Sequence, residues 1–262
     1  MDENIEIDVS IAPNFFAPKC ADRDLNFDIR NSHAIVTSRC NFQCSFCKHG
    51  ISGEKSNYMT FSNYESIIKE LMNQGKMFKF TGGEPCMNPY IKEMVEVVKN
   101  NGGIVFLDTN GSMTNVVTSL LKNRLIDVLG VSLKGLTSKE ALKTSNTINP
   151  LLCWRNVLNT IETATKYENV RVIVTYVAYN DFKYSDLCKF SKILDKFGDN
   201  IYLKINNLCG KEHRDQNLKT LDAEILPKMI VEFIKKNPKW KNRTILVNSS
   251  DGVSNYSKII FS

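Results

Sequence analysis

The sequence predicts an α/β protein in which helices cover a parallel sheet. Two patterns support this class: short apolar, β-branched runs alternate with amphipathic helical segments between residues 33 and 210, and the helical segments start and stop at recognisable residues. Composition agrees, since 42% of the 262 residues are hydrophobic and 24% are charged, as in one large globular domain. Strands joined by helical crossovers run parallel, so functional residues are expected at their carboxyl ends.

Six strands and five intervening helices are expected. Apolar and β-branched residues place the strands at 33–37, 77–81, 104–107, 128–133, 170–179 and 201–205. Apolar residues three and four positions apart mark helices that begin near Ser62, Pro89, Val116, Pro150 and Leu187. Ser62 and Glu65 form the sequence signature of a capping box at the first of these helices. The segment 134–149 is predicted to be a long polar connection.

Two extensions flank the predicted core, which spans residues 33–210. Residues 1–32 are polar, and the alternation of apolar and polar residues over 5–9 predicts an edge strand. In the second extension, residues 211–262, a final helix is expected over 221–234, and a further edge strand is expected over 244–247.

Three cysteines follow the first predicted strand at the spacing C-x₃-C-x₂-C, namely Cys40, Cys44 and Cys47. Thiolates at this density select zinc or iron–sulfur centres. Structural zinc usually takes two pairs of ligands, but the next cysteine, Cys86, is far along the chain, and His49 would have to reach back over a very short loop. The spacing therefore favours a [4Fe–4S] cluster whose fourth iron is open to another ligand. A non-catalytic metal-binding module that uses the loop structurally is the alternative from another class.

This cysteine spacing, with Phe46 before the last cysteine, resembles the radical S-adenosylmethionine (radical SAM) superfamily. The resemblance implies a partial (β/α)6 TIM-like barrel with short terminal extensions. It also implies that S-adenosylmethionine (SAM) chelates the open iron and is cleaved to a 5′-deoxyadenosyl radical, which takes a hydrogen atom from a substrate. A reductant protein of the flavodoxin or ferredoxin type belongs to this expectation. Only Cys209 follows Cys188, so no domain with an auxiliary cluster is expected.

Residues at other predicted strand ends resemble further motifs of the family. Gly82–Pro85 resemble the GGEP motif, whose backbone holds the SAM amino group, and Thr109–Asn110 precede a glycine in a Thr-Asn-Gly turn. A cation such as Lys134 is the electrostatic partner expected for the SAM carboxylate, although a solvent-facing lysine fits the sequence equally well. The resemblance thus implies a set of SAM contacts: Phe46, Gly82, Gly83, Glu84, Pro85, Thr109, Asn110, Ser132 and Lys134. Asn206, near the end of the sixth predicted strand, is a candidate contact to the ribose or the substrate, and a structural role fits it equally well.

The substrate stays open at this point, and no catalytic side chain is assigned. A lysine at the end of the fourth predicted strand, Lys134, resembles the basic residue of the glycyl-radical activating enzymes, and this favours a peptide or protein substrate. The residues before Cys40, however, depart from the W-x-x-G-C pattern of those enzymes. The order of three segments, 131–135, 154–156 and 204–210, resembles a wybutosine-type tRNA-modifying branch. A small-molecule biosynthetic intermediate is a further alternative. Cys86 and Cys209 receive no role.

Charge and cysteine content bound the setting. The net charge is +6, with lysines concentrated late in the chain, yet no aromatic-interleaved motif accompanies them, so RNA is the less favoured partner. No apolar run approaches the ~20 residues that span a bilayer, and the polar N-terminus does not resemble a signal peptide. Eight cysteines then indicate reduced thiols and metal binding. We expect a cytoplasmic, anaerobic enzyme.

Overall fold

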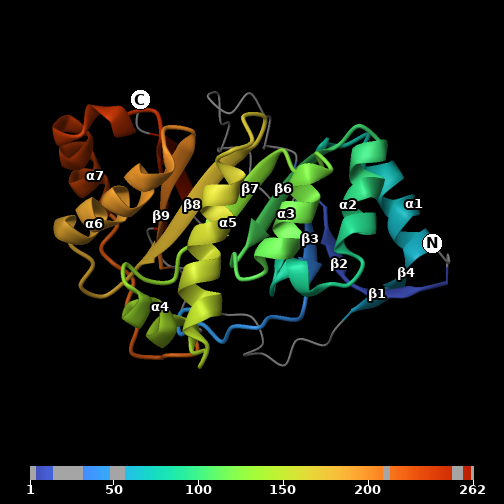
Figure 1. The fold of residues 1–262 in the computed structure, drawn as a ribbon, viewed down its shortest axis with the longest axis horizontal. Helices are drawn as coiled ribbons and strands as arrows, with labels where there is room; N and C mark the ends of the chain where they lie inside the picture. Colours follow the sequence, from blue (N-terminus) through green and yellow to red (C-terminus); the bar gives the residue numbers. More distant parts are fainter. Residues whose placement is uncertain (1–3, 14–31, 48–56, 209–212, 250–255, 261–262) are drawn as a thin grey trace.

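Figure 1 shows the computed structural model, which describes residues 4–13, 32–47, 57–208, 213–249 and 256–260. The strands of the described chain are β1 Glu6–Asp8, β2 Ser10–Ala12, β3 Ser32–Thr37, β4 Tyr58–Thr60, β5 Met77–Gly82, β6 Ile104–Thr109, β7 Val128–Ser132, β8 Arg171–Ala178, β9 Ile201–Asn207, β10 Thr244–Ser249 and β11 Tyr256–Ile260. The α-helices are α1 Phe61–Leu71, α2 Ile91–Asn100, α3 Thr114–Lys122, α4 Ser138–Ser145, α5 Asn156–Ala164, α6 Tyr184–Leu194 and α7 Ile225–Lys236. None of these helices combines the length and apolar character that a bilayer span requires.

One nine-stranded sheet organises the described residues. Its spatial order is β11-β10-β9-β8-β7-β6-β5-β3-β2, and every neighbouring pair from β3 to β10 is parallel. Helices pack along the sheet between the strands that they connect (Figure 1). Because β2 and β11 do not pair with each other, the described sheet does not close. The structure is therefore the mixed α/β, mostly parallel fold that the sequence predicts, in the form of a partial barrel.

The two faces of the sheet differ in chemistry. Alternate residues such as Phe78 and Leu107 are fully buried in the large apolar core that the strands share with the helices. The other alternate set includes Lys79 and Asp108, whose charged groups lie 2.6 Å apart. Successive side chains of a strand point to opposite faces, so this ion pair lies on the face away from the core. The sheet is thus apolar toward the helices, whereas its other face carries this ion pair next to a smaller apolar cluster that includes Ile173.

Three sequence expectations about elements are corrected by the structure. The first helix begins at Phe61, with the Thr60 hydroxyl accepting a hydrogen bond from the Asn63 N–H, so Ser62 lies inside the helix. The 244–247 segment is not an edge strand: β10 pairs with β9 on one side and β11 on the other. The alternating run over 5–9 forms β1, which pairs with β4 in a separate ribbon, and the edge of the sheet is formed by the next strand, β2.

The connection expected over 134–149 contains α4, a helix that its polar composition concealed. The Thr137 hydroxyl accepts a hydrogen bond from the Glu140 N–H at 3.2 Å, and the Glu140 carboxylate accepts one from the Leu136 N–H at 2.8 Å. These reciprocal bonds act like a capping box and satisfy N–H groups near the start of the helix. The Thr-x-x-Glu spacing was the available sequence signal.

Candidate active site at the cysteine loop

The cysteine loop, residues 38–47, begins directly after β3 at the carboxyl edge of the parallel strands. The Cys40 side chain is exposed, Cys44 is buried and Cys47 is half-buried, and the Cys47 N–H donates a 3.0 Å hydrogen bond to the Cys44 carbonyl. As they stand, no three Cys, His, Asp or Glu side chains of the described chain are gathered closely enough to hold a metal ion. The donor set itself, three thiols from one short loop, fits an iron–sulfur cluster.

The surroundings of the Cys40 and Cys44 thiols affect how readily they lose their protons to bind iron. Desolvation is the main cause that raises the pKa of the Cys40 thiol to about 11, and it also raises the pKa of Cys44. The Lys134 ammonium lowers the pKa of both thiols and so opposes that effect. Iron binds thiolates, so binding must displace the thiol protons, and a nearby cation favours the anionic form that remains.

Gly82 and Gly83 allow the end of β5 to lie directly against the start of the cysteine loop. A Cβ at Gly83 would lie 2.2 Å from the Arg39 carbonyl oxygen, and one at Gly82, where φ is +108°, would lie 2.3 Å from that of Thr37. In this close contact the N–H groups of Gly83 and Glu84 donate to the Thr37 and Arg39 carbonyls, both at 2.7 Å. The sequence suggested that these glycines allow a ligand to approach the backbone closely. In the structure, what approaches them closely is the backbone of Thr37 and Arg39.

The Glu84 side chain joins this glycine turn to the end of β6. It is fully buried, and one carboxylate oxygen accepts hydrogen bonds from the Thr109 hydroxyl at 2.6 Å and the Cys86 N–H at 3.0 Å. The other oxygen accepts from the Asn110 N–H at 2.6 Å. Desolvation raises the pKa of Glu84, and the hydrogen bonds act in the opposite direction. Because the carboxylate is enclosed, a ligand meets this motif at its backbone.

Asn110 continues the connection from β6 to the cysteine loop. Its side-chain N–H₂ donates to the Asn41 side-chain oxygen at 2.8 Å, and its own side-chain oxygen accepts from the Ser112 N–H at 2.9 Å. Asn41 in turn donates to the Ser112 hydroxyl at 2.9 Å. The sequence prediction omitted Asn41 and Ser112, since a polar residue in a loop gives no signal without its partner.

Lys134 points toward the cysteine loop and away from solvent. Its side chain is only 9% exposed, its ammonium donates to the Ser132 hydroxyl at 2.7 Å, and the same nitrogen lies 5.1 Å from the centre of the Phe46 ring. The structure therefore brings together three of the predicted SAM contacts. It also decides between the two sequence interpretations of Lys134 in favour of a site-facing cation.

The second half of the loop is held by main-chain hydrogen bonds to two segments that the sequence did not connect with it. The N–H groups of Gln43 and Ser45 donate to carbonyls at the end of α4, from Ser145 at 3.0 Å and Thr144 at 2.9 Å. On the other side, the Asp215 N–H donates to the Ser45 carbonyl at 2.9 Å.

The remaining predicted residues lie near the site or outside the described residues. Asn206 lies on β9, and its side-chain oxygen is buried without a hydrogen-bond partner among the described residues. Pro85 and Cys86 are buried next to Glu84, and the Cys86 sulfur lies 3.9 Å from the Thr109 hydroxyl. Cys209 falls outside the described residues.

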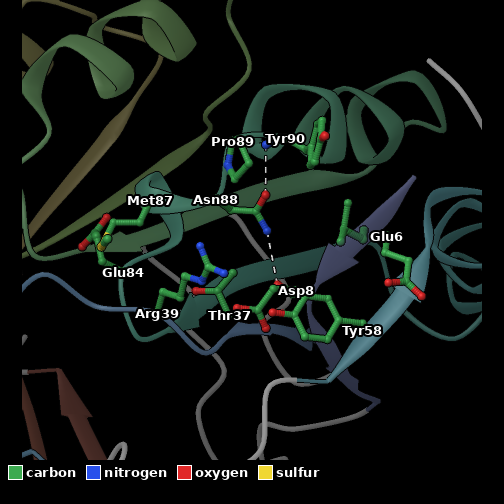
Figure 2. A pocket seen from close by; sticks show the side chains of 11 residues that line it. Glu6, Asp8, Thr37, Arg39, Tyr58, Glu84, Met87, Asn88, Pro89 and Tyr90 are labelled. Carbon is green, nitrogen blue, oxygen red and sulfur yellow. Dashed lines mark hydrogen bonds between the residues drawn. The ribbon is translucent and has the colours of Figure 1, made fainter. Parts of the chain in front are cut away.

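A pocket of about 120 Å³ lies under the N-terminal ribbon, next to Thr37 and Arg39 (Figure 2). Asn88 crosses it, donating to the Asp8 carbonyl at 3.2 Å and accepting from the Tyr90 N–H at 2.9 Å. None of the three motif cysteines lines this pocket. It separates β1 and β4 from the Gly82–Pro85 turn, so it is not where chemistry at the thiols would occur.

Comparison with known proteins identifies the family of this sequence. The model of the Radical SAM superfamily matches residues 34–193, more than half of the chain. A "Probable GTP 3',8-cyclase" of Methanococcus aeolicus is 25% identical over 82% of this chain and 74% of its own length. "Molybdenum cofactor biosynthesis protein 1" of Dictyostelium discoideum is 25% identical over 80% of this chain, which spans only 33% of that protein.

Solved structures show the same fold at low identity. SuiB of Streptococcus suis bound to the precursor peptide SuiA has a TM-score of 0.62 at 16% identity, covering 77% of this chain and 45% of SuiB. TYW1 with a lysine-pyruvate adduct has a TM-score of 0.59 at 15% identity, covering 91% and 83% of the two chains. The anSMEcpe structure with bound AdoMet gives 0.58 at 21% identity, covering 78% and 58%. The chain therefore belongs to the radical SAM superfamily, whose enzymes use a [4Fe–4S] cluster and SAM.

Proposed function

We propose that Cys40, Cys44 and Cys47 hold the [4Fe–4S] cluster and that this enzyme abstracts a hydrogen atom from a small polar substrate. The observation that supports the assignment most strongly is the cysteine loop, which carries three thiols, is fixed on both sides and faces the enclosed ammonium of Lys134. When bound, the cluster and SAM supply the 5′-deoxyadenosyl radical that takes the hydrogen atom. The chain's own residues bind, orient and shield the reactants.

The residues around the loop have distinct proposed roles. The N–H groups of Gly83 and Glu84 are already engaged with Thr37 and Arg39, so their turn offers carbonyl oxygens, which suit an ammonium group such as the SAM amine. Lys134, with Ser132 beside it, binds the SAM carboxylate by charge-assisted hydrogen bonding. The Phe46 backbone lies against the adenine. Asn206, whose buried side-chain oxygen needs a donor, receives a ribose or substrate hydroxyl.

A small polar substrate is favoured over a peptide for two reasons. The sequence argument for a peptide depended on Lys134, which lies beside Ser132 and Phe46. Because we assign these residues to SAM, Lys134 no longer favours a peptide substrate. The face of the sheet away from the core carries the charged pair of Lys79 and Asp108, which suits a polar molecule. The similarity to a probable GTP 3',8-cyclase, an enzyme named for its action on a nucleotide, supports the same choice. A flavodoxin- or ferredoxin-type reductant is the proposed electron donor.

The function is tested with protein purified and reconstituted without oxygen. Wild-type protein is expected to hold iron and sulfide, to absorb visible light and, after reduction, to convert SAM to 5′-deoxyadenosine. Cys44→Ala is expected to lose the cluster and with it this product. Cys153→Ala is the matched control, because Cys153 is buried in the same small apolar cluster as Cys44 but lies outside the motif.

Each outcome has a clear meaning. Product formation by the Cys44→Ala variant would contradict the ligand assignment, and zinc without visible absorbance in the wild-type protein would favour the non-catalytic metal-binding module. For the substrate, the dialysable fraction of an anaerobic extract is expected to stimulate 5′-deoxyadenosine formation more than the peptide or tRNA fractions do. Stimulation by the peptide fraction alone would overturn the choice of a small molecule.

A further inference from the structure

A short segment after β9 contacts the cysteine loop at the residue before its last cysteine. A ring nitrogen of His213, Nδ1, lies 3.1 Å from the Phe46 carbonyl oxygen, although the two residues are 167 positions apart in the sequence. His213 is 3% exposed. The neighbouring main chain makes a second contact, since the Asp215 N–H donates to the Ser45 carbonyl at 2.9 Å.

The chemistry of this contact fixes its direction. A carbonyl oxygen only accepts hydrogen bonds, so His213 must carry its proton on Nδ1 and donate it to Phe46. The Gln216 side chain donates a hydrogen bond to the His213 carbonyl, which holds the main chain of this segment in place. A buried donor held in this way determines how the peptide between Phe46 and Cys47 is oriented. That peptide joins the proposed adenine contact to a proposed cluster ligand.

We propose that His213 is a positioning residue for SAM binding, acting through the Phe46 carbonyl. The inference rests on the proposed function, because it takes Cys47 as a ligand and the Phe46 backbone as the adenine contact. His213 acts only through the Phe46 carbonyl and is assigned no contact of its own with the cluster or with SAM. Its hydrogen bond holds the Phe46–Cys47 peptide in the orientation that SAM requires, while the α4 carbonyls hold the opposite side of the same loop.

Two substitutions separate the hydrogen bond from the volume of the ring. His213→Phe keeps a buried ring but has no donor, whereas His213→Asn is smaller and retains an amide N–H near the position of Nδ1. With reconstituted protein, the SAM concentration at half-maximal 5′-deoxyadenosine formation is expected to rise about fivefold in the Phe variant, a factor typical of one lost hydrogen bond. The Asn variant is expected to stay near wild type.

His33 supplies a matched control. It is a fully buried histidine on β3 whose Nε2 lies 3.2 Å from the Gly75 carbonyl, at the other end of the strand from the cysteine loop. His33→Phe therefore removes the same kind of contact and is expected to lower the melting temperature while leaving the SAM dependence unchanged. Iron content and the SAM-induced change in the electron paramagnetic resonance spectrum of the reduced cluster are measured for every variant.

The outcomes separate this inference from the proposed function. A wild-type protein without a cluster removes the proposed function, whatever His213 does. If the wild-type protein is active, an unchanged SAM dependence in His213→Phe overturns the inference, and so does an Asn variant as impaired as the Phe variant. Loss of iron from the Phe variant at a wild-type melting temperature, with recovery in the Asn variant, supports it. Loss of iron from both variants overturns it.

Discussion

The two halves of the cysteine loop are fixed by different kinds of contact. Near its start, the loop meets glycines and buried side chains: Gly83 packs on Arg39, and Asn110 bonds to Asn41. From Gln43 onward, the described hydrogen bonds to other segments are made by main-chain groups, with His213 as the side-chain contributor. The first half therefore depends on residue identity and the second mostly on the path of the backbone.

This difference predicts where the loop is sensitive to mutation. A side-chain anchor is lost when its residue is replaced, but every residue other than proline offers an N–H and a carbonyl. Substitutions at the anchors of the first half should therefore cost more stability than substitutions around the second half. Three substitutions test this comparison, from the largest expected effect to the smallest.

Gly83→Ala is expected to have the largest effect. The new Cβ would lie 2.2 Å from the Arg39 carbonyl oxygen and 2.6 Å from the Arg39 carbonyl carbon, so the backbone before Cys40 must move. We expect a loss of about 3 kcal/mol in the free energy of unfolding, together with loss of iron from reconstituted protein. Denaturant titration and iron analysis measure the two effects.

Gly102→Ala is the control for this substitution. Gly102 has φ of +80° but nothing within 4 Å of an added Cβ, so only the backbone strain of about 1 kcal/mol applies. Iron content is expected to match wild type. Equal losses of stability and iron in the two variants would show that the close approach of Gly83 to Arg39 has no special role.

Glu84→Gln is expected to have the next largest effect. The amide keeps the shape of the side chain but replaces one acceptor oxygen by a donor, which must face the N–H of Asn110 or the donors of Thr109 and Cys86. An unpaired buried donor costs about 2 kcal/mol, to be measured by denaturant titration. In the control Glu96→Gln, at a half-buried residue in an ion pair with Lys92 at 3.5 Å, we expect a change within about 0.5 kcal/mol. Similar losses in both variants would refute the role of Glu84 as a buried connector.

The contrast also explains what the sequence could reveal. The parallel strands were predictable because buried strands are written as runs of apolar residues. The cysteine site was predictable because its three ligands lie close together in the sequence. The role of Glu84 was not predictable, since its partner Thr109 is 25 positions away and nothing in either residue indicates the pairing. The family motif concerns the backbone of this segment, so it gave no indication of what the Glu84 side chain contacts.

Hydrogen bonds made by main-chain groups are even harder to predict from a sequence. The carbonyls of Thr144 and Ser145 reach the loop only because α4 forms where a polar connection was expected, and any residue could supply them. The position of β10 inside the sheet was likewise hidden, because it depends on β11, which pairs with β10 on its outer side. Contacts that depend on the path of the chain, and not on residue type, were the ones that the sequence prediction missed.

Tyr179→Phe is expected to have the smallest effect. The lost hydroxyl lies 3.4 Å from the Thr144 hydroxyl, a long contact, and the ring that remains keeps its place 6.3 Å from the Phe46 ring. Because Thr144 holds Ser45 through its carbonyl, that anchor survives, and the free energy of unfolding should fall by no more than about 0.5 kcal/mol. Thr109→Val removes a hydroxyl from the residues that support the first half of the loop. It should cost about 1–2 kcal/mol in the same titration, since it breaks a buried 2.6 Å hydrogen bond to the Glu84 carboxylate. If the Tyr179 hydroxyl proved the costlier of the two to remove, the second half of the loop would depend on side chains after all, and the division between the halves would be wrong.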